Sequence, residues 1–201
     1  MSRRNVVRSN NPTEGRERII RAAFGLFAER GYYGVSISDV AESAGLVKSS
    51  IYHHFESKEA LYVAVLSETC DALRDEMQAS ARGRNWKVRL RSTVLTLARS
   101  LGPHSHSLGL ILEGITHTPS NAKRSTKAIA ELRQNLFSVL VREIANGIAA
   151  GDLEPTDSTM TAACLIGLIV SVLQADQNQS EDKRVNFAFN LFLQGALRRK
   201  K

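Results

Sequence analysis

The spacing of apolar residues constrains this chain most, because that spacing is helical along almost the whole sequence. Ile19, Ala23 and Phe27 recur at intervals of four, and Leu136 and Leu140 repeat the interval in the second half. The four prolines fall between such segments, at positions where helices start or end. No convincing run alternates apolar and polar residues as a half-buried strand does. The sequence therefore predicts an all-α fold.

Composition and cysteine usage exclude small scaffolds held by metals or disulfides. The chain has 201 residues, 43% of them hydrophobic and 23% charged, so it can bury a sizeable core unaided. Cys70 and Cys164 lie far apart in the sequence, and no Cys/His ligand cluster occurs. His104, His106 and His117 have no carboxylate or cysteine at ligand spacing. We therefore expect neither a disulfide framework nor a metal site.

Hydropathy and charge bear on location and partners. The longest apolar run, residues 162–173, is too short to span a bilayer, and no apolar segment follows the basic N-terminus. These features predict a soluble, cytoplasmic protein with no membrane partner. The formal net charge of +7 suits a polyanionic partner. It does not locate a binding surface, because both halves of the chain carry part of the excess.

Two short helices joined by a tight turn are expected between residues 36 and 55. Ser36 and Asp39 have nearly the spacing of a capping box at the start of the first helix. Gly45 suits the left-handed residue that ends that helix. The second helix is expected from Lys48 to about residue 55.

The two faces of this helix pair differ in chemistry. The inner face is apolar and comprises Val40, Ala41, Ala44, Leu46, Ile51 and Phe55. The outer face carries hydrogen-bonding side chains, namely Lys48, Ser49, Tyr52 and His53, with Ser50 and His54 alongside. A recognition helix that reads DNA bases has this division. A helical hairpin with no role in DNA binding has it too, and periodicity alone does not decide between them.

Longer motifs in residues 16–62 resemble the N-terminal domain of the TetR family of bacterial transcriptional regulators. The motifs are the helix end 27–32 (FAERGY), 38–41 (SDVA), 44–46 (AGL) and 51–61 (IYHHFESKEAL). The resemblance implies a leader at 1–12, a three-helix helix-turn-helix domain at 13–62 and a larger helical effector-binding and dimerisation domain at 63–201. The expected helices of the DNA-binding domain include one from the N-cap Thr13 to Gly31. A long helix over about 58–81 follows, with Ser57 as its N-cap.

Carried over by position, the resemblance implies a set of DNA contacts. Base contacts are implied for Lys48, Ser49 and Tyr52, with Ser38 as a further candidate. Phosphate contacts are implied for Ser50, Tyr52, His53, His54 and Lys58. Arg3, Arg4 and Arg8 of the leader are either a minor-groove arm or a solvated tail. The sequence departs from the family at Val47, which has no capping oxygen, so the recognition helix is expected to form fully only on DNA.

The C-terminal part is expected to provide a dimer interface and an effector pocket. Its last two helices, about 156–176 and 181–198, are apolar around much of their circumference. The resemblance implies that they pair with their symmetry mates in a homodimer, whereas a plain monomer core would explain the same pattern. It also implies an apolar pocket lined by Trp86, Leu90, Leu108, Leu112, Glu113, Thr116, His117, Phe137 and Leu165.

These features together predict a homodimeric repressor that a small, largely apolar effector releases from a palindromic operator. A dimeric DNA-binding regulator without a small ligand is an alternative that the sequence does not separate from the first. A small helical enzyme is a third, but no nucleophile, metal or dinucleotide motif occurs. We therefore expect a protein that is not an enzyme and has no cofactor.

Overall fold

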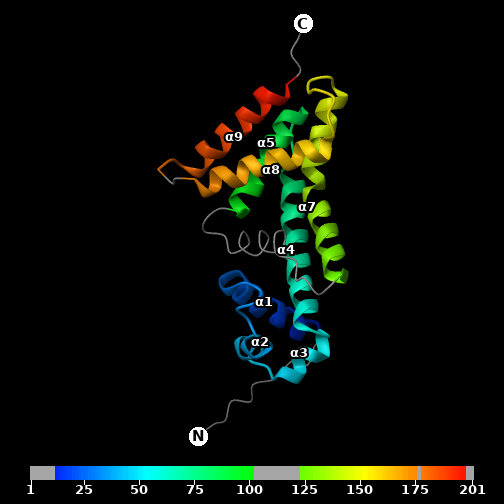
Figure 1. Cartoon of the computed structure of the whole chain (residues 1–201), viewed down its shortest axis with the longest axis vertical. Coiled ribbons are helices and arrows are strands. Elements are labelled where there is room, and N and C mark those ends of the chain that lie inside the picture. Colours follow the sequence, from blue (N-terminus) through cyan, green and yellow to red (C-terminus); the bar gives the residue numbers. More distant parts are fainter. Residues whose placement is uncertain (1–11, 102–122, 176–177, 198–201) are drawn as a thin grey trace. The chain divides into compact units, whose positions relative to one another are not determined.

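The computed structural model describes residues 12–101, 123–175 and 178–197. These ranges contain eight helices (Figure 1). Their residues outside the helices form turns, bends and one isolated bridge between Leu153 and Leu197. The prediction of an all-α fold is confirmed. The chain divides into two compact units, residues 1–65 and 66–201, which are described in turn.

The N-terminal unit contains α1 (Pro12–Arg30), α2 (Ile37–Ala44), α3 (Lys48–His54) and the first turns of α4 (Lys58–Ser80). Side chains from all four helices meet in its core, and Ile19, Ile51 and Leu61 are completely buried. The Phe27 and Tyr62 rings pack edge to face there with their centroids 5.1 Å apart. This core holds the pair α2 and α3 against α1 and α4.

The start of α1 differs from the prediction. The helix begins at Pro12, so Thr13 lies within its first turn and is not the N-cap. Proline suits this position because its ring fixes a helical φ and the first amides of a helix have no intrahelical partner. The other end agrees with the sequence, since α1 stops at Arg30 and Gly31 has a positive φ.

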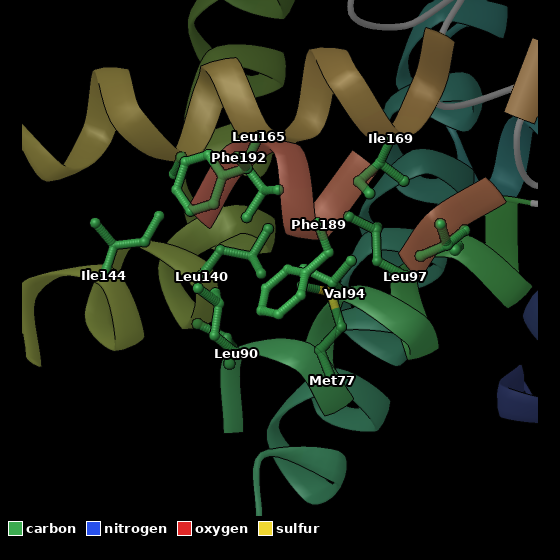
Figure 2. Packing of buried hydrophobic residues seen from close by; sticks show 14 of the residues in the cluster. Met77, Leu90, Val94, Leu97, Leu140, Ile144, Leu165, Ile169, Phe189 and Phe192 are labelled. Atoms are coloured by element: carbon green, nitrogen blue, oxygen red, sulfur yellow. The ribbon is translucent and has the colours of Figure 1, made fainter. Parts of the chain in front are cut away.

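The C-terminal unit contains the rest of α4, α5 (Trp86–Leu101), α7 (Lys123–Ala149), α8 (Ser158–Gln174) and α9 (Glu181–Ala196). Helices α8 and α9 pack side by side and also against α5 (Figure 1). One apolar cluster fills the space between the helices, with Leu90, Leu140, Leu165 and Ile169 completely buried (Figure 2). The last two helices therefore contribute one side to the monomer's core.

Candidate nucleic-acid interface

A reciprocal capping box fixes the start of α2, as the sequence predicts. The Asp39 amide donates to Ser36 Oγ at 3.2 Å, and the Ser36 amide donates to Asp39 Oδ2 at 2.7 Å. These bonds satisfy two backbone donors that have no partner within the helix. The bond from the Ser36 amide also lowers the pKa of the Asp39 carboxyl.

A left-handed glycine ends α2 and begins the turn into α3. Gly45 has φ 63° and ψ 39°, a conformation that side chains with a Cβ rarely adopt. Its amide donates to Glu42 O at 3.0 Å, and the Leu46 amide donates to Ala41 O at 2.8 Å. The turn therefore directs α3 away from the axis of α2 within three residues.

Helix α3 has the two faces that its sequence predicts. Ile51 is completely buried and Phe55 is nearly so, whereas Leu46 in the preceding turn is half-buried. The opposite face is open, and the Tyr52 side chain is 54% exposed. The structure thus exposes Lys48, Ser49, Tyr52 and His53 on α3, whereas Ser50 and His54 are only partly accessible.

The start of α3 lacks a side-chain cap. Val47 occupies the N-cap position, and no side-chain hydrogen bond forms there. Helix α3 spans Lys48–His54 in the structure. The expectation that it forms fully only on DNA stays a prediction. The buried side chains of Ile51 and Phe55 stabilise the helix independently of its cap.

Two further predicted residues, Lys58 and Ser38, lie on the neighbouring helices α4 and α2. Lys58 begins α4, where the Ala60 amide donates to Ser57 Oγ at 3.0 Å, so Ser57 caps the helix as predicted. The Lys58 ammonium lies 4.3 Å from the centroid of the Tyr32 ring, a cation–π contact that leaves the side chain half-buried. Ser38 is half-buried in the first turn of α2.

A long-range contact at the α2–α3 turn had no signal in the sequence. Arg18 of α1 donates from Nη2 to the carbonyl oxygen of Ala44 at 2.6 Å, across 26 residues. Arginine in the first half of an amphipathic helix is normally read as a solvated residue. Only the packing of α1 against α2 places its guanidinium at the end of α2.

The predicted effector-lining residues that the structure describes belong to a packed core. Trp86, Leu90 and Leu165 are buried, and Phe137 packs against the same cluster. Figure 2 shows Leu90 and Leu165 within it. The Trp86 indole donates from Nε1 to Asp152 Oδ2 at 2.8 Å. The remaining predicted lining residues lie outside the described ranges, and they are Leu108, Leu112, Glu113, Thr116 and His117.

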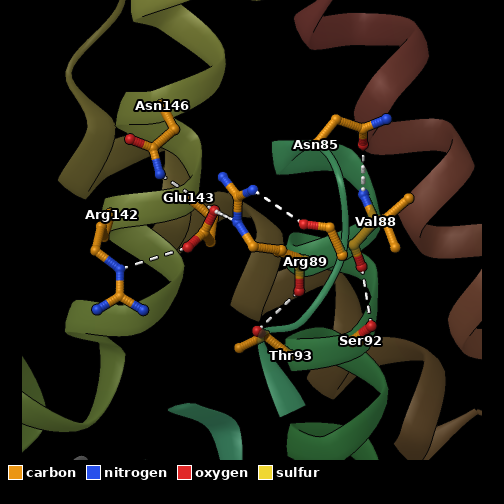
Figure 3. Close-up of polar contacts among 9 residues, drawn as sticks. Asn85, Val88, Arg89, Ser92, Thr93, Arg142, Glu143 and Asn146 are labelled. Carbon is orange, nitrogen blue, oxygen red and sulfur yellow. Dashed lines mark hydrogen bonds and ion pairs between the residues drawn. The ribbon is translucent and has the colours of Figure 1, made fainter. Parts of the chain in front are cut away.

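A buried carboxylate lies near Trp86 and joins α5 to α7. The Glu143 side chain is only 3% exposed and receives a hydrogen bond from Arg89 Nε at 2.7 Å (Figure 3). Asn146 Nδ2 donates to the same carboxylate at 3.2 Å, and Arg142 Nε lies 3.4 Å from its other oxygen. This network compensates a charge that burial would otherwise destabilise.

The described ranges contain neither a set of metal ligands nor a membrane-spanning helix. No three His, Cys, Asp or Glu side chains gather there as a set of metal ligands, and His104, His106 and His117 lie outside those ranges. None of the described helices is long and apolar enough to cross a membrane.

A capped helix, a left-handed glycine turn and a second helix with an open polar face form the helix-turn-helix geometry that many DNA-binding proteins use. Residues 19–65 match the family described as "Bacterial regulatory proteins, tetR family". The helix-turn-helix domain of this chain therefore belongs to the TetR family of bacterial transcriptional regulators. The chain is a DNA-binding regulator, as the resemblance implied.

Similar proteins extend beyond the helix-turn-helix. The HTH-type transcriptional repressor KstR2 of Rhodococcus jostii is 25% identical over 142 residues, which cover 69% of this chain and 70% of that protein. KstR2 of Mycolicibacterium smegmatis is 38% identical over 64 residues, or 32% of this chain and 31% of that one. The second match covers less than a third of the Mycolicibacterium protein, so it says nothing about the similarity of the remaining residues.

Solved structures share the fold across most of the chain. FadR from Bacillus subtilis, in complex with stearoyl-CoA, has a TM-score of 0.74 at 21% identity and covers 89% of this chain and 98% of its own. AibR, in complex with isovaleryl coenzyme A and operator DNA, has a TM-score of 0.73 at 19% identity and covers 88% and 97%. At these identities the likeness concerns the fold alone.

Proposed function

We propose that this chain is a homodimeric repressor that binds a palindromic operator and leaves it when a small, largely apolar effector binds the C-terminal unit. The observation that carries the proposal is the arrangement of α3. Its buried face anchors the helix through Ile51 and Phe55, while Tyr52 on the opposite face is free to reach DNA. Such a helix matches the width of the major groove.

We assign base reading to the exposed residues at the start and middle of α3. Lys48 and Ser49 belong to its first turn, and Tyr52 lies one turn further on. Their donors and acceptors suit base edges, as does the Ser38 hydroxyl of α2. Phosphate contacts are assigned to residues that border this face, namely Ser50, Tyr52, His53, His54 and Lys58.

Selection of bound duplexes from a random pool, at about 150 mM salt, tests this assignment. A palindrome should be enriched, and Tyr52→Ala should abolish its enrichment. Lys48→Ala should relax the preference at one base pair by about 1–3 kcal/mol. Lys58→Ala should weaken binding to all sequences alike. It should also reduce the salt slope, which is the slope of log affinity against log salt concentration, by about one.

Lys127→Ala is the matched control for these lysine variants. It removes one positive charge from an exposed side chain of α7, whose ammonium lies 3.8 Å from the Glu131 carboxylate. Binding should not change. Equal losses for Lys48→Ala on operator and random duplexes would show that Lys48 is not a base reader.

The proposed dimer uses the outer faces of α8 and α9. Met160 is 71% exposed, Phe187 is 65% exposed, and Leu191 lies one turn beyond Phe187 and is also exposed. Cys164 and Gly167 continue the stripe along α8 with no charged residue between them. An apolar stripe across two adjacent helices is typical of a protein interface, and a twofold axis would present two recognition helices to a palindrome.

Sedimentation of Phe187→Asp tests the dimer, with Val88→Asp as its control. Both variants place a carboxylate at an exposed apolar position, but Val88 lies on α5, outside the stripe. Phe187→Asp should sediment as a monomer and Val88→Asp as the wild type does. A dimer that persists in Phe187→Asp would exclude this face.

The effector part of the proposal rests on the continuity of α4 and on the neighbours' ligands. Helix α4 runs unbroken from Lys58, in the DNA-binding unit, to Ser80 in the C-terminal unit, so a change at one end can be transmitted to the other. FadR and AibR were solved with acyl-CoA esters, which carry an apolar acyl chain. A nearly complete switch requires about 5.5 kcal/mol of preference for the released state.

A regulator without a small ligand is the competing function. The burial of Trp86, Leu90 and Leu165 in one apolar cluster favours it, because a ligand among them would have to displace packed side chains. Stearoyl-CoA and isovaleryl-CoA are the first probes to titrate into the operator complex. Release at micromolar concentration would support the effector, whereas unchanged operator affinity with these and other acyl compounds would favour the ligand-free regulator.

A further inference from the structure

The guanidinium of Arg18 joins α1 to the turn of the helix-turn-helix. Its Nη2 donates to Ala44 O at 2.6 Å, and Ala44 is the last residue of α2. The same nitrogen is 3.3 Å from the place that a Cβ on Gly45 would occupy, so the guanidinium lies beside the turn. One arginine thus fixes the point where the chain leaves α2 for α3.

This carbonyl is one that helix geometry leaves without a partner. The last four carbonyls of a helix receive no intrahelical hydrogen bond. The turn amides of Gly45 and Leu46 donate to Ala41 and Glu42 and do not reach Ala44. Arg18 supplies the donor, and its positive charge is favourable at the negative end of the helix dipole.

The contact has consequences for α3 because α3 has few constraints of its own. It is seven residues long, begins four residues after Ala44 and has no side-chain cap at Val47. Its inner face provides one fully buried anchor, Ile51. The direction in which α3 leaves the turn therefore depends strongly on what holds the turn.

We propose that Arg18 is a positioning residue for base readout, which sets the angle of α3 through the carbonyl of Ala44 without touching DNA. This inference rests on the proposed function, because it assumes that α3 reads bases. It distinguishes Arg18 from the phosphate-binding residues, whose loss weakens all DNA alike. Losing Arg18 impairs the match between α3 and its operator and leaves electrostatic binding to random DNA intact.

Arg18→Ala, measured on operator and random duplexes over a range of salt, tests the proposal. Operator affinity should fall by about tenfold, which is the effect of losing a charge-assisted hydrogen bond. Affinity for random DNA and the salt slope should stay as in the wild type. Arg18→Lys, which keeps a charged donor, should recover part of the operator affinity.

Arg21→Ala is the control. Arg21 lies one turn along α1 and lines the same surface groove as Arg18 and Ser43. Removing it deletes the same charge at nearly the same place, and operator affinity should not change. If Arg18→Ala lowers the affinity for operator and random duplexes equally, and lowers the salt slope by about one, Arg18 contacts a phosphate directly. That result would overturn the proposal. Wild-type discrimination in Arg18→Ala would overturn it as well.

Amide hydrogen exchange in the absence of DNA is a second test of the positioning role. The Ser50 amide donates to Val47 O at 2.9 Å in the first turn of α3. It should exchange about tenfold faster in Arg18→Ala, while amides in the middle of α1 keep their protection. Unchanged exchange at Ser50 refutes the positioning role even if the wild type selects no palindrome. Loss of protection throughout the unit would instead show that Arg18 acts on general stability.

Discussion

Replacing Glu143 by glutamine should destabilise the C-terminal unit by about 2–3 kcal/mol. The substitution keeps the shape of the side chain and removes a charge that is only 3% exposed. The Arg89 guanidinium then loses the negative charge that lies 2.7 Å from its Nε. Breaking a fully buried pair costs about 3–5 kcal/mol, but the Arg89 side chain is 25% exposed and regains some hydration. The expected cost therefore falls below that range.

The single tryptophan allows the loss of stability to be measured in the C-terminal unit alone. Trp86 is the chain's one tryptophan, is buried and belongs to the C-terminal unit, so its fluorescence follows the unfolding of that unit. With a urea m-value of about 2 kcal/mol/M, the midpoint should fall by about 1–1.5 M and the slope should not change. A changed slope would show that two-state unfolding has been lost.

Arg142→Ala is the matched control for Glu143→Gln. The Arg142 side chain is 50% exposed and its Nε lies 3.4 Å from the same carboxylate, so its loss should cost less than about 1 kcal/mol. If both variants shift the midpoint equally and slightly, the buried pair contributes no more than a surface pair, and the reasoning from burial is wrong.

Three further predictions concern the turn, the capping box and the thiols. Gly45→Ala should destabilise the N-terminal unit by about 1–2 kcal/mol because φ is 63°, whereas Gly25→Ala, with open space around it, should stabilise α1 by about 0.5–1 kcal/mol; thermal unfolding measures both. The lowered pKa of Asp39 means that its carboxylate stabilises the fold above about pH 4, and this contribution is lost as the pH falls through the folded pKa. Below that pH range, the protection of α2 amides from hydrogen exchange should therefore fall less in Asp39→Asn than in the wild type. Cys164→Ser should leave no rapidly reacting thiol in the native protein, since Cys70 is buried and desolvation raises its pKa to about 11; a thiol that still reacts rapidly with Ellman's reagent would contradict this.

Local sequence rules predicted the helix-turn-helix well because its geometry is set by near neighbours. The Ser36 and Asp39 capping box spans three residues, and the turn at Gly45 depends on the conformation of one glycine. The burial of Ile51 and the exposure of Tyr52 follow from helical periodicity. Each of these features is determined within one or two turns of chain.

Features that depend on contacts between distant segments were not predictable in the same way. The bond from Arg18 to Ala44 spans 26 residues, and that from Trp86 to Asp152 spans 66. Apolar character predicted that Leu90 and Leu165 lie inside, but it could not say whether they line a cavity or fill a core. In the structure both side chains are completely buried in one apolar cluster of the C-terminal unit.

The missing cap of α3 offers a test of how far the order of the recognition helix limits DNA binding. Val47 has φ −90° and ψ 154°, close to the φ −106° and ψ 159° of Ser36, which caps α2. Its backbone is thus already in the N-cap conformation and lacks only an acceptor oxygen. Because Val47 is 65% exposed, Val47→Ser should gain a bond to an α3 amide at little cost in buried surface. The expected gain is about 0.5–2 kcal/mol, seen as slower hydrogen exchange at Ser50.

Val47→Ala separates the cap from the loss of the valine side chain, since it has no oxygen either. If ordering α3 is part of the free-energy cost of binding, Val47→Ser should bind operator more tightly than Val47→Ala. The ratio of their affinities should not exceed the ratio of their Ser50 amide exchange rates. If exchange slows and operator affinity stays the same, α3 is already ordered in the free protein. In that case, the contacts that position α3 decide operator affinity, and its helicity does not.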